Sequence, residues 1–178
     1  MTKEEFDQVF DGVVGQDHIV QNREELWWLV QQVQEISPKK ILDVGTAHGG
    51  TLRFWQELAE HTYSIDPNSG QFQVKFHPNR PPPILLIGKS QSKEIIAAVK
   101  EHAPFDFCFI DGDHAYESCK QDWENYSPMV RPGGLVGFHD VGESNFVETC
   151  GQVFNEISFP DKRHFHRLMG IGLVRIPE

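Results

Sequence analysis

The sequence predicts an α/β fold of three layers, in which a mostly parallel sheet carries helices on both faces and ends in an antiparallel strand. Helical and strand-like segments alternate along most of the 178 residues, which favours a parallel sheet. The last two strand-like segments, about 162–168 and 170–176, meet at Gly170, and strands joined this directly pair antiparallel. Hydrophobic residues at 39% and charged residues at 24% fit a single globular domain.

Each earlier predicted strand is a short apolar segment that leads into a turn. Segment 40–45 runs into a glycine-rich turn, and segment 62–66 ends at Asp66, where Pro67 begins another turn. The predicted strands are 40–45, 62–66, 84–87, 105–110, 135–138, 162–168 and 170–176, which makes seven.

Helical spacing of apolar residues predicts the segments between the strands. An opening helix is expected at about 17–36, and the Ser37–Pro38 pair stops it. Further helices are expected around 52–58, after the N-cap residue Ser92, over 116–126, and through Phe146, Cys150, Val153 and Ile157. We expect residues 1–37 to form a helical cap or lid and residues 38–178 to form the α/β domain of one compact unit.

Charge and composition exclude several classes of partner. The net charge is −10, and no run of Lys and Arg exceeds two residues, whereas nucleic-acid binding needs a basic face. No stretch of 18 apolar residues predicts a membrane helix, and the charged start lacks the apolar segment of a signal peptide. Three cysteines, Cys108, Cys119 and Cys150, are expected to be buried thiols. These observations predict a cytoplasmic protein that binds neither nucleic acid nor membrane.

The strongest local pattern is the segment 43–50, DVGTAHGG, between a predicted strand and a predicted helix. Its glycines allow close approach of the backbone to a ligand, and the helix start offers unpaired N–H groups. Asp43, two positions before the first glycine, would repel a pyrophosphate but suits a cationic ligand. Asp66, at the end of the next strand, lies where a ribose would bind. The alternative interpretation is a tight turn at 43–50 and a simple Asp-Pro turn at Asp66.

Four segments in order resemble the class I S-adenosylmethionine-dependent methyltransferases, which have a Rossmann-like fold. The likeness is strongest to a short branch related to sugar and antibiotic O-methyltransferases and covers about residues 38–176. The segments are 41–50 (ILDVGTAHGG), 64–66 (SID), 107–114 (FCFIDGDH) and 131–140 (RPGGLVGFHD). The resemblance implies that Gly45, Ala47 and Gly49 line the methionine end of the cofactor, Asp66 binds its ribose and Ser90 contacts its adenine. The full predicted cofactor set is Asp43, Gly45, Thr46, Ala47, His48, Gly49, Asp66, Ser90 and Asp111.

A second cluster of polar residues follows the fourth and fifth predicted strands. Carboxylates and imidazoles that converge at this edge are suited to a hard or borderline cation. The similar catechol-type methyltransferases hold magnesium here, and their pattern implies Asp111, His139 and Asp140 as ligands. Histidine replaces a carboxylate or amide ligand, so manganese is expected beside magnesium. The alternative is that these groups only hydrogen-bond to loop backbones and the cofactor.

His114 stands where the catechol-type family has a catalytic lysine, and it is the predicted general base, with Asp111 beside it. A rival role is to orient the substrate or cap the next helix. The predicted function is O-methylation of a small-molecule hydroxyl of sugar, polyketide or phenolic type. The alternatives are a catalytically silent or repurposed cofactor-binding domain and a nucleotide-cofactor oxidoreductase. The sequence leaves the acceptor undefined and leaves a homodimer open.

Overall fold

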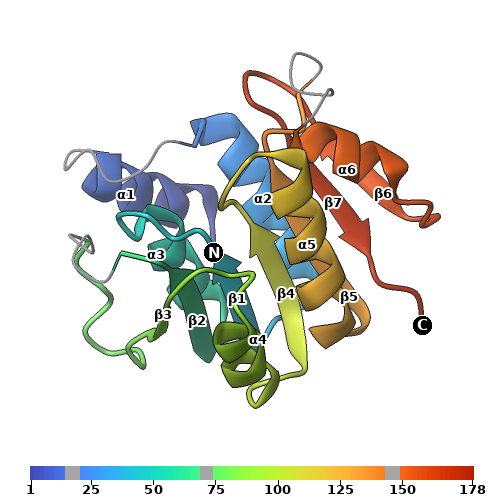
Figure 1. Cartoon of the computed structure of the whole chain (residues 1–178). Helices are drawn as coiled ribbons and strands as arrows, with labels where there is room; N and C mark the ends of the chain where they lie inside the picture. The colour runs from blue at the N-terminus through green and yellow to red at the C-terminus, as the bar shows by residue number, and fades with distance from the viewer. Residues whose placement is uncertain (15–20, 69–73, 143–148) are drawn as a thin grey trace.

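The computed structural model describes residues 1–14, 21–68, 74–142 and 149–178 and contains a seven-stranded sheet between two layers of helices (Figure 1). The strands are β1 (Lys40–Val44), β2 (His61–Asp66), β3 (Ile84–Ile87), β4 (Phe105–Ile110), β5 (Val130–His139), β6 (Lys162–Phe165) and β7 (Ile171–Arg175). Their order in the sheet is β3-β2-β1-β4-β5-β7-β6. Strand β7 is antiparallel to β5 and β6, and the other neighbours are parallel, which confirms the predicted fold class.

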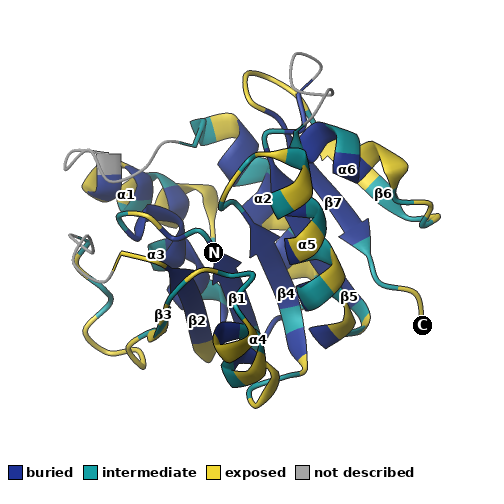
Figure 2. Cartoon of the chain, in the orientation of Figure 1, coloured by how far each residue is buried: buried dark blue, intermediate teal, exposed yellow. Residues whose placement is uncertain are grey.

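The helices cover the sheet in two groups, each with its own hydrophobic core (Figure 2). The helices are α1 (Lys3–Val14), α2 (Arg23–Glu35), α3 (Gly50–Leu58), α4 (Lys93–Lys100), α5 (Tyr116–Tyr126) and α6 (Cys150–Glu156), with a 3-10 turn, η1 (Ser127–Met129). Helices α1, α2 and α3 pack around Trp55 and the sheet residues Phe107 and Phe109. Helices α4, α5 and α6 pack on the other face, around Tyr126 and Phe138.

Strands β1 to β4 and β7 lie within one residue of their predicted bounds, and β6 ends at Phe165, three residues earlier than predicted. Helix α1 lies in the segment 1–37 that was expected to be helical, but no separate helix was predicted there, although Phe6, Phe10 and Val13 recur at helical spacing and are buried. The predicted helix 17–36 begins only at Arg23, because the Asn22 side chain caps it by accepting hydrogen bonds from the N–H groups of Glu24 and Glu25. Residues 17–20 of that prediction, and Phe146 of the last predicted helix, lie outside the described residues.

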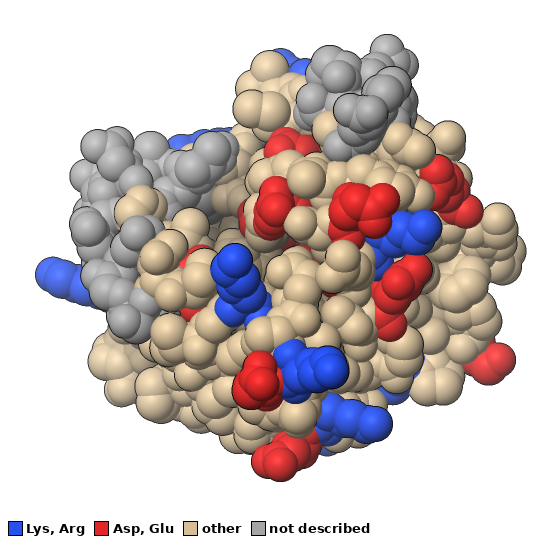
Figure 3. Space-filling view, viewed as in Figure 1, with Lys and Arg blue, Asp and Glu red and all other residues tan. Residues whose placement is uncertain are grey.

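Strand β5 is longer than predicted. The predicted turn around residues 132–134 is part of the strand, and the pairing of β4 with β5 shifts register between Phe105 and Phe107 to accommodate it. All three cysteines are buried, as predicted, and none forms a disulfide. Among the described residues, no helix is both long and apolar enough to cross a membrane. On the face shown in Figure 3, Lys and Arg are interspersed with Asp and Glu instead of forming one basic area.

A single carboxylate joins the starts of three sheet strands. Asp106 on β4 accepts hydrogen bonds from the backbone N–H groups of Lys39 and Lys40, at 2.8 and 2.9 Å, and from Nε of Arg131 on β5, at 2.6 Å. Burial raises the pKa of Asp106, but Arg131 and the two N–H groups outweigh burial and hold this pKa below its usual value. The ionised form of Asp106 therefore stabilises the fold.

Replacement Asp106→Asn is expected to lower the free energy of unfolding at pH 7 by about 1–3 kcal/mol, because a charge-assisted interaction is lost. The folded-state pKa lies below the usual 3.8, so this stabilisation is present above pH 3.8 and fades as the pH falls through the folded value. Urea unfolding at pH 7 and pH 3 should give a smaller difference between wild type and variant at pH 3. The exposed acid Glu101, changed to Gln, is the control. An undiminished difference at pH 3 would contradict this role for Asp106.

Candidate active site

The predicted site residues gather at the carboxyl ends of β1, β2, β4 and β5, where the strand order of the sheet reverses. Such a switch point is the usual ligand-binding edge of an open α/β sheet. Two adjoining cavities lie there, of about 440 and 270 Å³. Both are lined by Gly45 and Ala47 from the turn after β1 and by Asp111 and Gly112 from the turn after β4. One ligand can therefore extend from one cavity into the other.

The turn between β1 and α3 has a backbone that only glycine allows at its key position. Gly45 has φ +89°, and a Cβ placed on it would lie 2.3 Å from both the carbonyl oxygen of Asp111 and Cα of Gly112. Position 45 requires glycine for two reasons. The backbone has a positive φ, and a side chain would prevent the contact between the ends of β1 and β4. Ala47 also has positive φ, at +46°, which is unusual for a residue with a side chain. The turn is held in a specific, strained shape.

Asp66 fixes that turn from the neighbouring strand. Its Oδ2 accepts a hydrogen bond from the N–H of Ala47 at 2.9 Å, and its Oδ1 accepts one from the N–H of Asn68 at 2.8 Å. The residue is 7% exposed and lines the 440 Å³ cavity together with Ser90. The predicted ribose and adenine contacts therefore lie in the same cavity.

Two side chains of helix α5 form hydrogen bonds with the Ser90–Gln91 segment. The hydroxyl of Tyr126 donates a hydrogen bond to the carbonyl of Ser90 at 2.5 Å, and Nε2 of Gln91 donates one to Oδ1 of Asp122 at 2.9 Å. Asp122 is fully buried, and burial raises its pKa to about 6. Asp122 was not among the predicted site residues, although it lies in the predicted helix 116–126, four residues before the buried Tyr126. One face of α5 thus shapes the predicted adenine end of the cavity.

Asp43 lies buried beneath the glycine turn and lines neither cavity. Oδ2 accepts a hydrogen bond from the Thr51 hydroxyl at 3.1 Å, whereas Oδ1 has no hydrogen-bond partner among the described residues. Burial raises the pKa of Asp43 to about 8, and the nearby carboxylate of Asp111 adds to this effect. The predicted contact of Asp43 with the cofactor stays a prediction, because in the ligand-free protein this carboxyl is buried and protonated at neutral pH.

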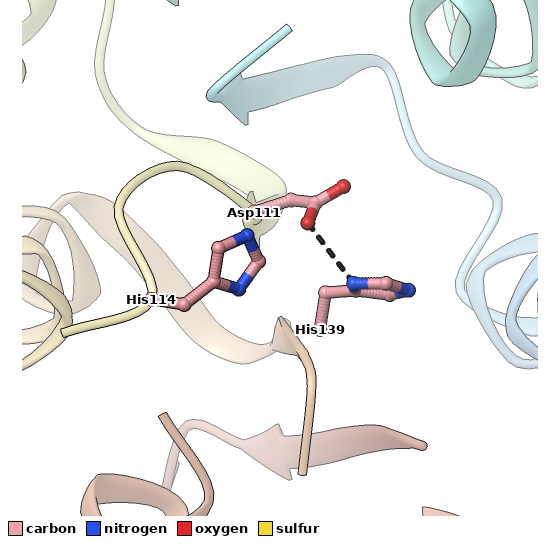
Figure 4. A group of neighbouring side chains, drawn as sticks. All are labelled: Asp111, His114 and His139. Atoms are coloured by element: carbon pink, nitrogen blue, oxygen red, sulfur yellow. Dashed lines mark ion pairs between the residues drawn. The ribbon is translucent and has the colours of Figure 1, made fainter. Parts of the chain in front are cut away.

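The 270 Å³ cavity contains a cluster of one carboxylate and two imidazoles. Ligand atoms of Asp111, His114 and His139 all lie within 4.8 Å of one another (Figure 4). Nδ1 of His139 lies 3.2 Å from Oδ1 of Asp111, and Nε2 of His139 is buried without a hydrogen-bond partner among the described residues. Burial lowers the pKa of His139, but Asp111 and Asp140 together raise it above its usual value. This donor set could hold a divalent cation.

Asp140 contacts both histidines of the cluster. Its Oδ2 lies 2.7 Å from Nδ1 of His114, and its Oδ1 lies 3.3 Å from Nδ1 of His139. The Asp140 backbone has φ +58°, a conformation that aspartate tolerates better than most residues. Asp140, followed by Cys150, raises the pKa of His114 to about 10. His114 is therefore an imidazolium at neutral pH when no other cation is present.

Gln21, which no sequence pattern indicated, reaches this cluster from the N-terminal side of α2. Its Nε2 donates a hydrogen bond to Oδ2 of Asp111, and Gln21 also lines the 270 Å³ cavity. Met169, from the turn between β6 and β7, lines the same cavity and was missed as well. Both residues lie far in sequence from the motifs, so only the tertiary structure places them here.

The remaining predicted residues are divided between the cavities and their surroundings. Thr46 and His48 line the 270 Å³ cavity, whereas Gly49 is the N-cap residue of α3, with φ +89°, and is not among the described lining residues of either cavity. A larger hollow of about 640 Å³ lies between α1, α3 and the segment around Arg80, but Arg53 and Arg80 both pair there with Glu57. The switch-point cavities are therefore the better candidate site.

Comparison with known families agrees with this geometry. A family model described as "Methyltransferase domain" matches residues 42–141, which run from within β1 to just past β5 and include all the residues that line the 440 Å³ cavity and most of those that line the 270 Å³ cavity. The chain belongs to this methyltransferase family. Its sheet order and antiparallel β7 are those of the class I S-adenosylmethionine-dependent methyltransferase fold that the sequence resembles.

Solved structures share this fold at low sequence identity. A Staphylococcus aureus structure described as a caffeoyl-CoA O-methyltransferase has a TM-score of 0.71 and 20% identity, covering 94% of this chain and 90% of that one. The methyltransferase MycE of mycinamycin biosynthesis, solved with Mg and S-adenosylhomocysteine, has a TM-score of 0.63 and 16% identity, covering 84% and 48%. The uncharacterized protein y4gI of Sinorhizobium fredii is 25% identical over 130 residues, which are 64% of this chain. The match spans only 14% of y4gI.

The raised pKa of Asp43 predicts a pH-dependent stability for the ligand-free protein. The folded state keeps a proton up to about pH 8 that the unfolded chain loses near 3.8, so stability falls as the pH rises between these values. Replacement Asp43→Asn removes this effect. We expect the stability of the variant relative to wild type to rise by about 1–4 kcal/mol between pH 5 and pH 8. Urea unfolding at several pH values measures it, with exposed Asp11→Asn as the control, and a constant difference would contradict the assignment.

Proposed function

We propose that this chain transfers the methyl group of S-adenosylmethionine to a hydroxyl oxygen of a small molecule. The observation that carries the proposal is the pair of cavities joined at Gly45, Ala47, Asp111 and Gly112. One cavity contains Asp66 and Ser90, which suit a nucleoside, and the other contains the cluster of Asp111 with two histidines, which suits an acceptor hydroxyl. The methyl group would lie where the two cavities meet.

The proposed cofactor position follows from the chemistry of each wall. The carboxylate of Asp66 can accept hydrogen bonds from the ribose hydroxyls, and the adenine would lie against the Ser90–Gln91 segment. The strained turn at Gly45–Ala47 lets the methionine part approach the backbone closely. The carboxylate of Asp111 supplies negative charge beside the cationic sulfonium and ammonium groups, whereas Asp43 lies buried beneath the turn and is protonated in the ligand-free protein. A dinucleotide would place its pyrophosphate against the Asp111 carboxylate, which disfavours the alternative of an oxidoreductase.

The transfer itself needs positioning and one proton acceptor. The acceptor oxygen attacks the methyl carbon while the sulfur–methyl bond breaks, its electron pair stays on sulfur, and S-adenosylhomocysteine is released. Positioning the two reactants can contribute about 7–11 kcal/mol at its upper range. The hydroxyl proton would pass to the His114–Asp140 pair. Because the pKa of His114 is raised to about 10, this pair accepts a proton only once His114 has lost its own.

We propose further that Asp111, His114 and His139 hold a divalent cation. The buried, unpaired Nε2 of His139 and the close approach of the three side chains support this. This ligand set differs from the set inferred by resemblance, because it contains His114 in place of Asp140. Asp140 instead contacts both imidazoles and orients them. Two imidazoles favour manganese or another transition metal over magnesium. When bound, the cation would lower the pKa of the acceptor hydroxyl and occupy the second ring nitrogen of His114, so the hydroxyl proton would pass to the Asp140 carboxylate of the pair.

Replacement Asp66→Asn is expected to weaken binding of S-adenosylhomocysteine about 10- to 100-fold, because a charged hydrogen-bond acceptor is lost both to the ribose and to the Ala47 N–H. Isothermal titration calorimetry measures this change. Asp11→Asn, at an exposed position of α1, should bind like wild type. Wild-type affinity in Asp66→Asn would remove Asp66 from the proposed cofactor site, and the absence of binding by the wild-type chain would overturn the proposed function.

Replacement His139→Ala is expected to weaken Mn²⁺ binding at least 10-fold, because one of three proposed ligands is lost. Titration with Mn²⁺, followed by electron paramagnetic resonance, measures the affinity without requiring a known acceptor. Affinity for S-adenosylhomocysteine should change little, because His139 lies outside the proposed nucleoside cavity. The exposed His61→Ala is a matched control. Equal Mn²⁺ affinity in His139→Ala and His61→Ala would contradict the proposed ligand set.

A further inference from the structure

Glu25 on α2 is a fully buried carboxylate far from the methyltransferase motifs. Its Oε1 accepts three backbone hydrogen bonds, from the N–H groups of Arg167, Leu168 and Gly170, at 2.9, 2.7 and 3.0 Å. Several N–H groups that converge on one anion form an arrangement otherwise used to bind ligands. Burial of a carboxylate costs free energy unless it is compensated in this way. The contact therefore fixes the turn between β6 and β7, residues 166–170.

The same turn is held from a second side. Its carbonyl groups at Met169 and Gly170 accept hydrogen bonds from the N–H groups of Gly142 and Val141, at 2.7 and 3.2 Å. Gly170 has φ +82°, and a Cβ there would lie 2.6 Å from the nitrogen of Gly142, so no larger residue fits. The turn is thus held between α2 and the end of β5.

This fixed turn presents apolar side chains beside the acceptor cavity. Strand β7 begins at Ile171, which pairs with His139, so the preceding turn lies next to the cluster of histidines. Met169 lines the 270 Å³ cavity, where the other described lining residues are polar or small. Leu168 is 68% exposed and Met169 is 45% exposed. Single exposed apolar residues are common, but here Met169 lines a cavity and the buried Glu25 carboxylate holds the backbone of its neighbours Leu168 and Gly170.

We propose that Leu168 and Met169 form an apolar wall of the acceptor site, that Glu25 is the residue that positions this wall, and that the acceptor carries an apolar substituent beside its reacting hydroxyl. This inference rests on the proposed function and narrows it to acceptors with a hydrocarbon part, as opposed to bare sugars. The flexible Met169 side chain suits substituents of several shapes. The polar side of the cavity, at Asp111 and His114, takes the hydroxyl end.

The test uses 4-alkylcatechols with methyl, ethyl, propyl and butyl chains and the full chain loaded with S-adenosylhomocysteine and Mn²⁺. Calorimetry should show affinity rising about two- to fourfold for each added methylene, as expected for burial of hydrocarbon. Methyl transfer from S-adenosylmethionine to the same series should show this trend in KM, with little change in kcat.

Surface variants keep the test independent of folding. Met169→Gln and Leu168→Gln should flatten the dependence on chain length and leave S-adenosylhomocysteine affinity unchanged. Ile87→Gln is the matched control, because Ile87 on β3 has the same 45% exposure as Met169 and lines neither cavity. Glu25→Ala should flatten the dependence as well, and Glu25→Gln, which keeps a hydrogen-bond acceptor, should restore part of it. A role of Glu25 in stability alone would leave the dependence of affinity on chain length unchanged, whereas a role in positioning the turn predicts that it changes.

The outcomes separate this inference from the proposed function. Binding of S-adenosylhomocysteine with no chain-length dependence in wild type, or with no alkylcatechol bound at all, overturns the apolar wall and leaves the methyltransferase proposal standing. The same dependence in Met169→Gln, Leu168→Gln and Ile87→Gln also overturns it. Failure of wild type to bind S-adenosylhomocysteine overturns the proposed function itself.

Discussion

The close approach of the ends of β1 and β4 is the constraint on which the whole site depends. At Gly45 there is no room for a Cβ, because the carbonyl of Asp111 and Cα of Gly112 lie where it would be. This contact joins the glycine turn, which suits a cofactor, to the strand end that carries Asp111. The two cavities share a wall for the same reason. The proposed cofactor cavity and the proposed acceptor cavity are therefore adjacent because the backbones at Gly45 and Gly112 are in contact.

Several aspartates lie at this edge of the sheet, and the need to compensate their buried carboxyl groups explains the contacts that they make. Asp43 is buried with a raised pKa, Asp66 is satisfied by backbone N–H groups, and Asp140 is paired with His114. Each carboxylate thus avoids an uncompensated buried charge by a different route: protonation, hydrogen bonding or ion pairing. A cationic ligand would act on the same groups, which is why their protonation and the proposed ligands are linked.

Sequence reasoning predicted the sheet and its central motifs because these are local signals. Apolar segments such as 84–87 and 105–110 became β3 and β4 with the predicted bounds, and the acids at strand ends came together because parallel strands end at one edge. Asp122 was missed because a charged residue in a helix is normally exposed, and only the fold shows that it holds Gln91. Gln21, Glu25 and Met169 were missed because their roles depend on contacts between distant segments.

Helix α5 is hydrogen-bonded to the Ser90–Gln91 segment, and helix α2 is hydrogen-bonded, through Glu25, to the turn at residues 166–170. The first set of hydrogen bonds supports the proposed nucleoside half of the site and the second supports the proposed acceptor half, and they use separate helices on opposite faces of the sheet. Selectivity for the molecule that is methylated can therefore diverge through α2 and the β6–β7 turn while the machinery for the methyl donor is preserved. Each of these two helices therefore supports one part of the site independently of the other.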